Sequence, residues 1–524
     1  MTYGLWLNKS LFSLTLLGCT CAMAQVIPDS SPATNGSSMT PTQLAALSPQ
    51  AFLQLLVSRS VEVQYSKLSS DVARLLKRGE EALYEPVGFM GIREEGRSRQ
   101  RTPDERLQNT MTAGTAILNE NAHSDEVGIR KKLPTGAEVA LSYKVARKSN
   151  NLIGQTSAYD AEYNTLLNLT LKQPLLRNAG RAVTETDRLV ADLEHQIALQ
   201  QLTQQTLKSS VEGLNLYWQL HRAQETLKLR QEAVASTQSL IADSNARVAA
   251  GKLPSSAVLE LQGVLLNRQA ELSRSQQALH DAQSKLFTAI NLVLTESSAP
   301  GTAPFSRTSP PATARVSLAQ ALDRWSPYQI GLLKHQQAQI RLNFARNQMF
   351  PVADFVLSYS GTGYGNKVQD TRNVTEQGSY PDWYFGVNLE FPLNGNQKSQ
   401  QQFLAQSARV TQAELEISAI QNSFANDFIV RANDLSVAYQ LLESSLEEVK
   451  LRQSIHEIER QRVNLGVGLL SALIQKQVDL TEAKQRQLEN QVRYELALAT
   501  WQYIQGSLLA EHQIEISAQV TAQQ

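Results

Sequence analysis

One short motif occurs twice in this chain, and it limits the possible folds more than any other feature. Each copy has Arg, Val, Gly, Ser, Ala and Gln at the same offsets, and the copies lie 215 positions apart, from Arg247 to Arg462. The first copy comprises Arg247, Val248, Gly251, Ser256, Ala257 and Gln262, and the second Arg462, Val463, Gly466, Ser471, Ala472 and Gln477. Each copy interrupts a long helical pattern at its Gly, which predicts two helical hairpin tips and a chain of two repeats.

Long helical patterns flank both copies. One runs from about residue 180 to 251 and another over 396–465, and roughly 70 residues at ~1.5 Å each make a helix of about 100 Å. In the return segment after the first tip, Leu recurs every seven residues, at Leu265, Leu272, Leu279 and Leu286. This spacing is typical of a coiled coil. We therefore predict long antiparallel coiled-coil hairpins.

The hydrophobic period changes to two before each long helix. The clearest case is 383–391, where apolar residues alternate with Tyr, Gly, Asn and Glu; the apolar residues are Trp383, Phe385, Val387, Leu389 and Phe391. Half-buried strands of a soluble sandwich would also alternate, but they need a second apolar layer, which the sequence lacks. We therefore predict strands that face lipid on one side and a wet lumen on the other. So few strands cannot close a barrel, so several chains must contribute.

The strand regions of the two repeats differ in length. Alternation also occurs in 138–144, 163–172 and 353–359, more weakly in 86–92 and 126–133, while 98–123, 147–160 and 360–380 are predicted to be polar loops. The first strand region, within about 86–173, is longer than the second, at 353–391. The first repeat therefore carries an insertion, which is either a long outer loop or an extra hairpin.

The predicted boundaries follow from these patterns. They are a signal peptide at 1–24, a flexible leader at 25–44, a first repeat at 45–294, a Pro-rich linker at 295–316, a second repeat at 317–510 and a polar tail at 511–524. The signal ends at Ala22-Met23-Ala24, which suits cleavage before Gln25. The preceding Leu16-Leu17-Gly18-Cys19 resembles a bacterial lipobox, so lipidation of Cys19 remains the alternative.

Composition excludes several classes of function. The formal net charge is zero, which argues against a nucleic-acid footprint. No apolar run after the signal is long enough for a membrane helix. The seven histidines have no spacing typical of helical metal ligands. No nucleophile elbow, phosphate loop or carboxylate pair is present, so we expect no catalysis, no cofactor and no metal.

The tip residues have expected structural roles. Gly251 and Gly466 would accept a left-handed backbone, and Ser256 and Ser471 would cap the returning helices. These roles do not explain why Arg247 and Arg462 repeat. We therefore also consider that both arginines contact a partner or close the end of a tunnel.

Together these features resemble the TolC-like outer membrane efflux protein family, over about residues 45–510. The resemblance rests on the doubled order of helix, strands, Gln-Pro-Leu or Phe-Pro-Leu exit, long helix, Arg-x-x-x-Gly tip and return helix. It implies an α+β homotrimer whose hairpins form a periplasmic helical barrel, fused to a transmembrane β-barrel of twelve strands, four from each chain. It also implies docking of the tips, including Arg247, Gly251, Arg462 and Gly466, on a periplasmic adaptor (a membrane fusion protein) and an inner membrane transporter.

One position departs from the family. Members often have Asp just after the Ser of the tip, and some close their tunnel with a ring of aspartates there. This chain has Ala257 and Ala472 instead, which argues against a carboxylate gate at that level.

The resulting functional expectation is a passive, porin-like exit channel in the Gram-negative outer membrane with a long periplasmic extension. It would export small molecules that an inner membrane pump delivers. The alternatives are a type I protein secretion duct, with the same architecture, and a periplasmic coiled-coil adaptor without a pore.

Overall fold

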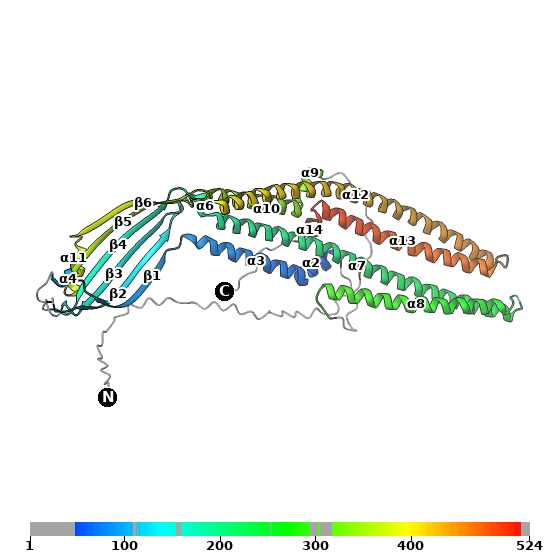
Figure 1. The fold of residues 1–524 in the computed structure, drawn as a ribbon. Helices are drawn as coiled ribbons and strands as arrows, with labels where there is room; N and C mark the ends of the chain where they lie inside the picture. The colour runs from blue at the N-terminus through cyan, green and yellow to red at the C-terminus, as the bar shows by residue number, and fades with distance from the viewer. Residues whose placement is uncertain are drawn as a thin grey trace, which may run out of the picture.

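The computed structural model describes residues 48–107, 112, 114–153, 159–251, 253–293, 302–303 and 317–514. The molecule is elongated, with a β-sheet at one end and two helical hairpin tips at the other (Figure 1). The signal peptide, Cys19 and the leader lie outside the described residues. The same is true of most of the linker and of the tail after Ile514.

The first helical region begins at Pro49, directly after Ser48. The Ser48 hydroxyl accepts a hydrogen bond from the Ala51 amide at 3.2 Å, and Pro49 occupies the first helical position. The region consists of two helices, α2 (Pro49–Arg59) and α3 (Val61–Glu81). Ser60 interrupts them with an extended backbone, and its hydroxyl donates to Glu62 at 2.6 Å. A short 3₁₀ turn, η1 (Ala82–Tyr84), then leads into the sheet.

The described strands form one antiparallel six-stranded sheet in chain order. They are β1 (Val87–Gln100), β2 (Ile117–Lys132), β3 (Glu138–Asn150), β4 (Glu162–Pro174), β5 (Val352–Gly365) and β6 (Pro381–Glu390). The first half of the chain supplies four strands and the second half two, and the β4–β5 pairing joins the halves. The insertion is therefore an extra hairpin, and the sheet of one chain has six strands where the family resemblance implies four.

All three predicted loops are partly regular structure, and β3 extends into 147–160 as far as Asn150. β1 and β2 extend through much of 98–123. Their outer ends were not predicted, because they are polar on both faces and show no alternation. The same region contains the short helix α4 (Pro103–Leu107). The predicted loop at 360–380 contains α11 (Val368–Glu376), which packs on β4 and β5. Glycines at 361, 363 and 365 leave room for α11, and the Thr165 hydroxyl donates to the Thr371 carbonyl at 2.9 Å.

The long hairpins match the predicted lengths. They are α7 (Thr186–Ala249) with α8 (Ser256–Ala289), and α12 (Gln397–Asn464) with α13 (Leu470–Ile504). α7 has 64 residues and α12 has 68. A short helix, α6 (Arg181–Thr184), precedes α7, and α14 (Leu508–Glu511) follows α13. The second repeat starts with two helices, α9 (Leu318–Arg324) and α10 (Ser326–Asn347), divided at Trp325.

Two apolar cores hold the helices together midway along the molecule. The first joins α2, α7, α8 and α13, and its largest buried members are Phe52, Leu220, Tyr217, Trp218 and Leu286. The second joins α9, α12 and α13, and its largest are Phe424, Leu435, Tyr494 and Trp501. α13 contributes to both cores, so it lies between the two halves of the helical region. No described helix combines the length and apolarity needed to cross a membrane.

Candidate functional site

The two hairpin tips lie together at the end of the molecule farthest from the sheet (Figure 1). At each tip the Gly has a left-handed backbone, as expected, with φ of 72° at Gly251 and 79° at Gly466. At the second tip the Val467 amide donates to the Arg462 carbonyl, and the Gly466 amide donates to the Val463 carbonyl. This pair of bonds is the Schellman helix ending, which satisfies carbonyls that the helix itself leaves unpaired.

The predicted serine caps are wrong. α8 begins at Ser256 itself, after Ser255, and α13 begins at Leu470, one residue before Ser471. Neither of the preceding cap residues makes a side-chain hydrogen bond to its helix. The first turns of the return helices therefore start without side-chain capping, and Ser256 and Ser471 lie within them.

Arg247 joins the two tips inside the chain. Its guanidinium donates to the Val463 carbonyl at 3.0 Å and to the Asn464 side-chain oxygen at 3.3 Å, so it contacts the last turn of α12. A cation at a helix C-terminus also suits the helix dipole. On the same interface the Gln477 amide donates to the Ser236 hydroxyl at 2.6 Å. One motif Arg and one motif Gln thus connect the first hairpin to the second.

Arg462 occupies the matching position of the second tip but has a different environment. It is exposed and pairs with Glu459 at 3.1 Å, one turn earlier on its own helix. Gln262, the counterpart of Gln477, is also exposed. The second copy of Arg and the first copy of Gln therefore lie on surfaces that face away from the contact between the hairpins.

A polar groove of about 690 Å³ lies between the two tips. α7 contributes Asp243, Ser244 and Arg247 to its lining, and α12 contributes His456 and Arg460. Burial lowers the pKa of His456 below its usual value. The groove offers hydrogen-bonding groups of both charges over a helical surface, which suits a polar protein partner better than a reacting small molecule.

The strand register places apolar residues of all six strands on one face of the sheet. That face carries Met90 and Ile92 from β1, Val127 and Ile129 from β2, Val139, Leu141, Tyr143 and Val145 from β3, Leu167, Leu169 and Leu171 from β4, Phe355, Leu357 and Tyr359 from β5, and Trp383, Phe385, Val387 and Leu389 from β6. Phe391 follows one residue after β6 and is exposed. We call this set the apolar sheet face.

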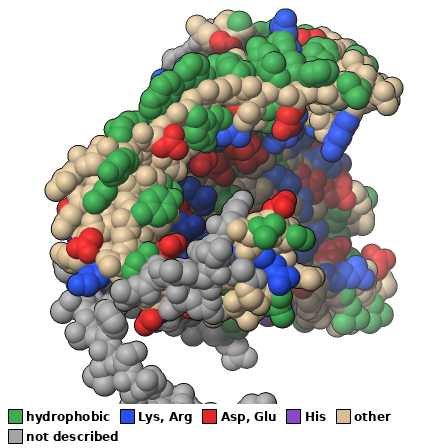
Figure 2. Space-filling model, turned by 60° about the vertical axis from the view of Figure 1, so that its left-hand side comes forward, with side chains coloured by type: hydrophobic (Ala, Val, Ile, Leu, Met, Phe, Trp, Pro, Cys, Tyr) green, Lys and Arg blue, Asp and Glu red, His purple; other side chains and the backbone are tan. Residues whose placement is uncertain are grey.

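The opposite face is polar. It carries ion pairs such as Lys148–Glu120 at 3.0 Å and Lys172–Asp354 at 2.9 Å. Figure 2 shows hydrophobic side chains along the outer surface of the sheet end, and acidic and basic side chains crowded within its hollow. The sheet therefore has one apolar face and one polar face.

A buried carboxylate where the strands meet the helices was missed by sequence reasoning. Glu185 separates α6 from α7 and accepts hydrogen bonds from Tyr84 at 2.9 Å, Arg181 at 2.9 Å and Arg188 at 2.5 Å. The hydrogen bond from Arg188, together with those from Arg181 and Tyr84, lowers the pKa of Glu185 to about 2. The spacing of Arg181 and Arg188, four residues before and three residues after Glu185, was visible in the sequence. The contact with Tyr84 could not be predicted, because it depends on the folded structure.

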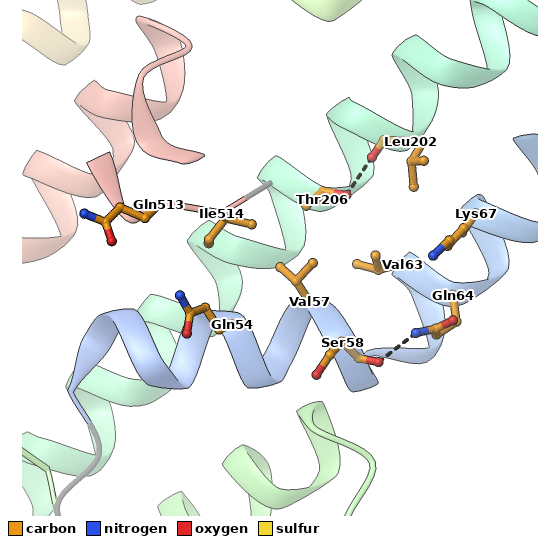
Figure 3. A pocket seen from close by; sticks show the side chains of 10 residues that line it. All are labelled: Gln54, Val57, Ser58, Val63, Gln64, Lys67, Leu202, Thr206, Gln513 and Ile514. Carbon is orange, nitrogen blue, oxygen red and sulfur yellow. Dashed lines mark hydrogen bonds between the residues drawn. The ribbon is translucent and has the colours of Figure 1, made fainter. Parts of the chain in front are cut away.

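A second cavity, of about 330 Å³, lies among α2, α3, α7 and the end of the described chain at Gln513 and Ile514. Figure 3 shows its lining, in which Lys67 is the one charged side chain and the drawn hydrogen bonds are local, such as that from Gln64 to the Ser58 carbonyl. This lining lacks a paired acid and base. Within the described residues, no group of three His, Cys, Asp or Glu side chains is placed to hold a metal ion.

Comparisons with known proteins inform the fold. No protein-family model matches the sequence. No curated protein matches it either.

Solved structures do match. The outer-membrane channel OprN has a TM-score of 0.63 at 12% identity, over 88% of this chain and 90% of its own. The CmeC outer membrane channel of Campylobacter jejuni has a TM-score of 0.62 at 10% identity, over 90% of each chain. The outer membrane protein VceC of Vibrio cholerae has a TM-score of 0.60 at 13% identity, over 88% of this chain and 96% of its own. The α+β fold, a sheet joined to long helical hairpins, is therefore that of outer membrane channels.

Proposed function

We propose that this chain is a subunit of a TolC-like channel in the Gram-negative outer membrane, which exports small molecules received from an inner membrane pump. The observation that carries the proposal is the apolar sheet face, continuous over six strands and joined to two hairpins of roughly 100 Å. Lipid is the environment in which such a face needs no protein cover. The proposal includes the two-repeat organisation and assigns no catalysis, cofactor or metal to the chain.

The proposal includes assembly of three copies into one channel. Both sheet edges, β1 and β6, have no partner strand on their outer side among the described residues. The helices on the two flanks carry exposed apolar stripes, which on α3 comprise Val61, Tyr65, Leu68, Val72 and Leu75, and on α12 comprise Val430, Val437, Leu451, Ile458 and Leu465. Exposed stripes at helical spacing favour burial against another helix. A ring of copies brings opposite flanks together.

The hairpin tips are the proposed docking surface for a periplasmic adaptor. Arg462 is exposed there, and Arg247 borders the groove between the tips. A protein secretion duct would have the same architecture and a different inner membrane partner. An adaptor without a pore is disfavoured, because the apolar sheet face would then lie in water.

Charge on the apolar sheet face tests the membrane assignment. Leu389→Asp places a carboxylate on that face, at a cost on the order of 1–2 kcal/mol for each chain. We expect a clear loss of assembled channel from outer membrane fractions, and the same for Trp383→Asp. Asn388→Asp, on the opposite face of the same strand, is the matched control and should assemble normally. Normal yield of Leu389→Asp, or a chain that stays soluble without detergent, contradicts the proposal.

Charge reversal at the exposed tip tests docking. Arg462→Glu should reduce export by intact cells while leaving assembly unchanged. Arg431→Glu, an exposed position on α12 away from the tip, is the control. Unchanged export by Arg462→Glu would leave the second tip with a structural role alone.

A further inference from the structure

We propose that all six strands of each chain form part of the transmembrane β-barrel. β1 of one copy then pairs with β6 of the next, and three copies close a barrel of eighteen strands. The inference rests on the proposed channel function and concerns a different question, namely the width of its exit. The alternative is a wall of twelve strands, in which the β1–β2 hairpin is displaced and β6 pairs with β3 of the next copy.

The depth of the apolar segments argues that β1 belongs to the wall. The register of the five strand pairings places Met90 of β1 in line with Pro381 of β6, measured perpendicular to the strands. The apolar segment of β6, however, is centred on Val387, six residues nearer the helices. Six residues of ~3.3 Å across five strand spacings of ~4.8 Å correspond to a tilt of about 40°. Membrane barrels tilt their strands by ~35–45°, so the apolar segments of β1 and β6 lie at one depth.

The exposure of β1 agrees with this placement. The side chain of Met90 is 77% exposed and that of Ile92 is 69% exposed, although both belong to the apolar sheet face. Beyond Ile92 the same face becomes polar, with Glu94 2.7 Å from His123. β1 thus shows the apolar-to-polar boundary expected of a strand that leaves the hydrocarbon layer.

The turn between β2 and β3 fixes the extra hairpin at the inner rim of the sheet. The Gly180 amide donates to the Thr135 carbonyl at 3.0 Å, and the Thr135 hydroxyl donates to Gln173 at 2.9 Å. Gly136 has a φ of 89° and lies so close to the Asn178 carbonyl that a Cβ would collide with it. β2 therefore ends, and β3 begins, at the same level at which β4 leaves the sheet.

The unpaired edges supply the remaining argument. In hydrocarbon an open strand edge leaves backbone groups without hydrogen-bond partners, which costs several kcal/mol for each group. β1 is fully paired with β2 on one side, over Val87–Gln100, so its other side needs a strand from elsewhere. The free side of β6 has the same need, and a second copy of this chain satisfies both.

The consequence is a wide exit. With a strand spacing of ~4.8 Å and a tilt of ~40°, eighteen strands give a backbone diameter of about 36 Å, against about 24 Å for twelve. The extra hairpin thus widens the outer opening without lengthening the helical hairpins.

Paired cysteines can identify the strand at the seam. Extending the observed tilt by one strand places Ile92 or Met90 of the neighbouring copy opposite Val387 on the apolar sheet face. We therefore test Val387→Cys combined with Ile92→Cys or with Met90→Cys, in the full chain in membranes, with oxidation and non-reducing electrophoresis. Val387→Cys with Tyr143→Cys tests the twelve-stranded alternative. Each single variant is a control, since the native cysteines, at 19 and 21, both precede the described residues.

The expected result is a covalent species of three chains, a threefold increase in mass, from the β1–β6 pairs and none from the β3–β6 pair. Cross-linking through Tyr143, or a covalent product that ends at two chains, overturns the inference. Absence of cross-links from both β1 pairs, in protein that still forms channels in planar bilayers, also overturns it and leaves the proposed function intact. Protein that forms no channels in bilayers rejects both.

Discussion

The two hairpins carry the same tip motif but have different surroundings. α8 packs on α7, whereas α13 packs on both α12 and α7. Positions that match in the repeat therefore differ in burial: His280 on α8 is exposed, and its counterpart Glu495 on α13 is partly buried. Within one chain the two hairpins meet where α13 packs against the first hairpin, and at the tips through Arg247 and the end of α12. The outer flanks of α8 and α12 are left for the neighbouring copies that we propose.

The interface between the two helices of a hairpin, which we call its seam, also differs between the two hairpins. In the first hairpin Arg268 is buried and donates to the Ala233 carbonyl at 2.8 Å and to the Thr237 hydroxyl. In the second hairpin the matching residue is Ala483, which has no exposed surface. Arg452, which matches Thr237, forms ion pairs with Glu448 and Asp479 at the surface. The same repeat thus has a buried cation in one hairpin only, where the Thr237 hydroxyl and the Ala233 carbonyl accept its hydrogen bonds.

The largest expected effect comes from making the second seam like the first. Ala483→Arg inserts a guanidinium into a filled site beside Arg452, and a buried charge without a partner costs about 3–5 kcal/mol. We expect the thermal unfolding midpoint, followed by circular dichroism, to fall sharply, with loss of assembled protein. Gln475→Arg, at an exposed position of the same helix, should be nearly neutral. A normal midpoint for Ala483→Arg would mean that the two seams are interchangeable.

The next effect depends on pH. Burial raises the pKa of Glu495 to about 7, so the folded chain favours the protonated carboxyl. This contribution to stability is complete below the ordinary pKa of ~4.5 and is lost as the pH rises through about 7. Glu495→Gln keeps a neutral side chain and should be more stable than the native protein at pH 8 by about 2 kcal/mol. Unfolding of the two proteins at pH 4 should differ little.

The His280→Gln variant is the matched control on α8. Because His280 is exposed, its replacement should change the unfolding midpoint little at either pH. A gain at pH 8 for His280→Gln equal to that of Glu495→Gln would remove the distinction between α8 and α13.

A smaller, local effect is expected at the tips. Arg247→Ala removes two hydrogen bonds to the end of α12 and should speed amide exchange in 459–466 about tenfold, corresponding to roughly 1–1.5 kcal/mol. Arg462→Ala, in the protein without its partners, should leave exchange in 244–251 unchanged. Hydrogen exchange with mass spectrometry measures both segments. Equal effects of the two variants would indicate that both arginines bridge tips in the isolated protein.

The smallest pair of effects involves two glycines, one within α8 and one just after the second tip. α8 continues through Gly263, around which there is open space, so Gly263→Ala should stabilise the helix by about 0.5–1 kcal/mol. Gly468 packs against the backbone of Val463, with no room for a Cβ, so Gly468→Ala should destabilise the second tip by about 1 kcal/mol. Unfolding midpoints should therefore move in opposite directions, and a shift of the same sign would contradict these environments.

The sequence predicted the long hairpins and their tips because those signals are local. Helical periodicity, and a Gly able to adopt positive φ, identify a hairpin end without knowledge of the rest of the chain. The strands with one apolar face were predicted for the same reason. The outer halves of β1 and β2 were not, because polar residues on both faces leave no period.

Contacts between distant segments escaped prediction. The bridge from Arg247 to α12 and the link from Tyr84 to Glu185 join residues whose proximity depends on the whole fold. The alternating glycines at 361, 363 and 365 were a usable local signal for a closely packed neighbour. They were visible in the sequence, but the helix that packs on them has a polar composition that resembles a loop.

The packing of α11 on β4 has a consequence for biosynthesis. The hydrogen bond from Thr165 to Thr371 joins positions 206 residues apart, and the two partners come from different halves of the chain. During translation the first four strands emerge long before β5, β6 and α11 exist. Until then the free edge of β4 lacks its partner strand and can pair with other chains. A periplasmic chaperone that shields this edge until the C-terminal half arrives would therefore raise the yield of correctly folded protein.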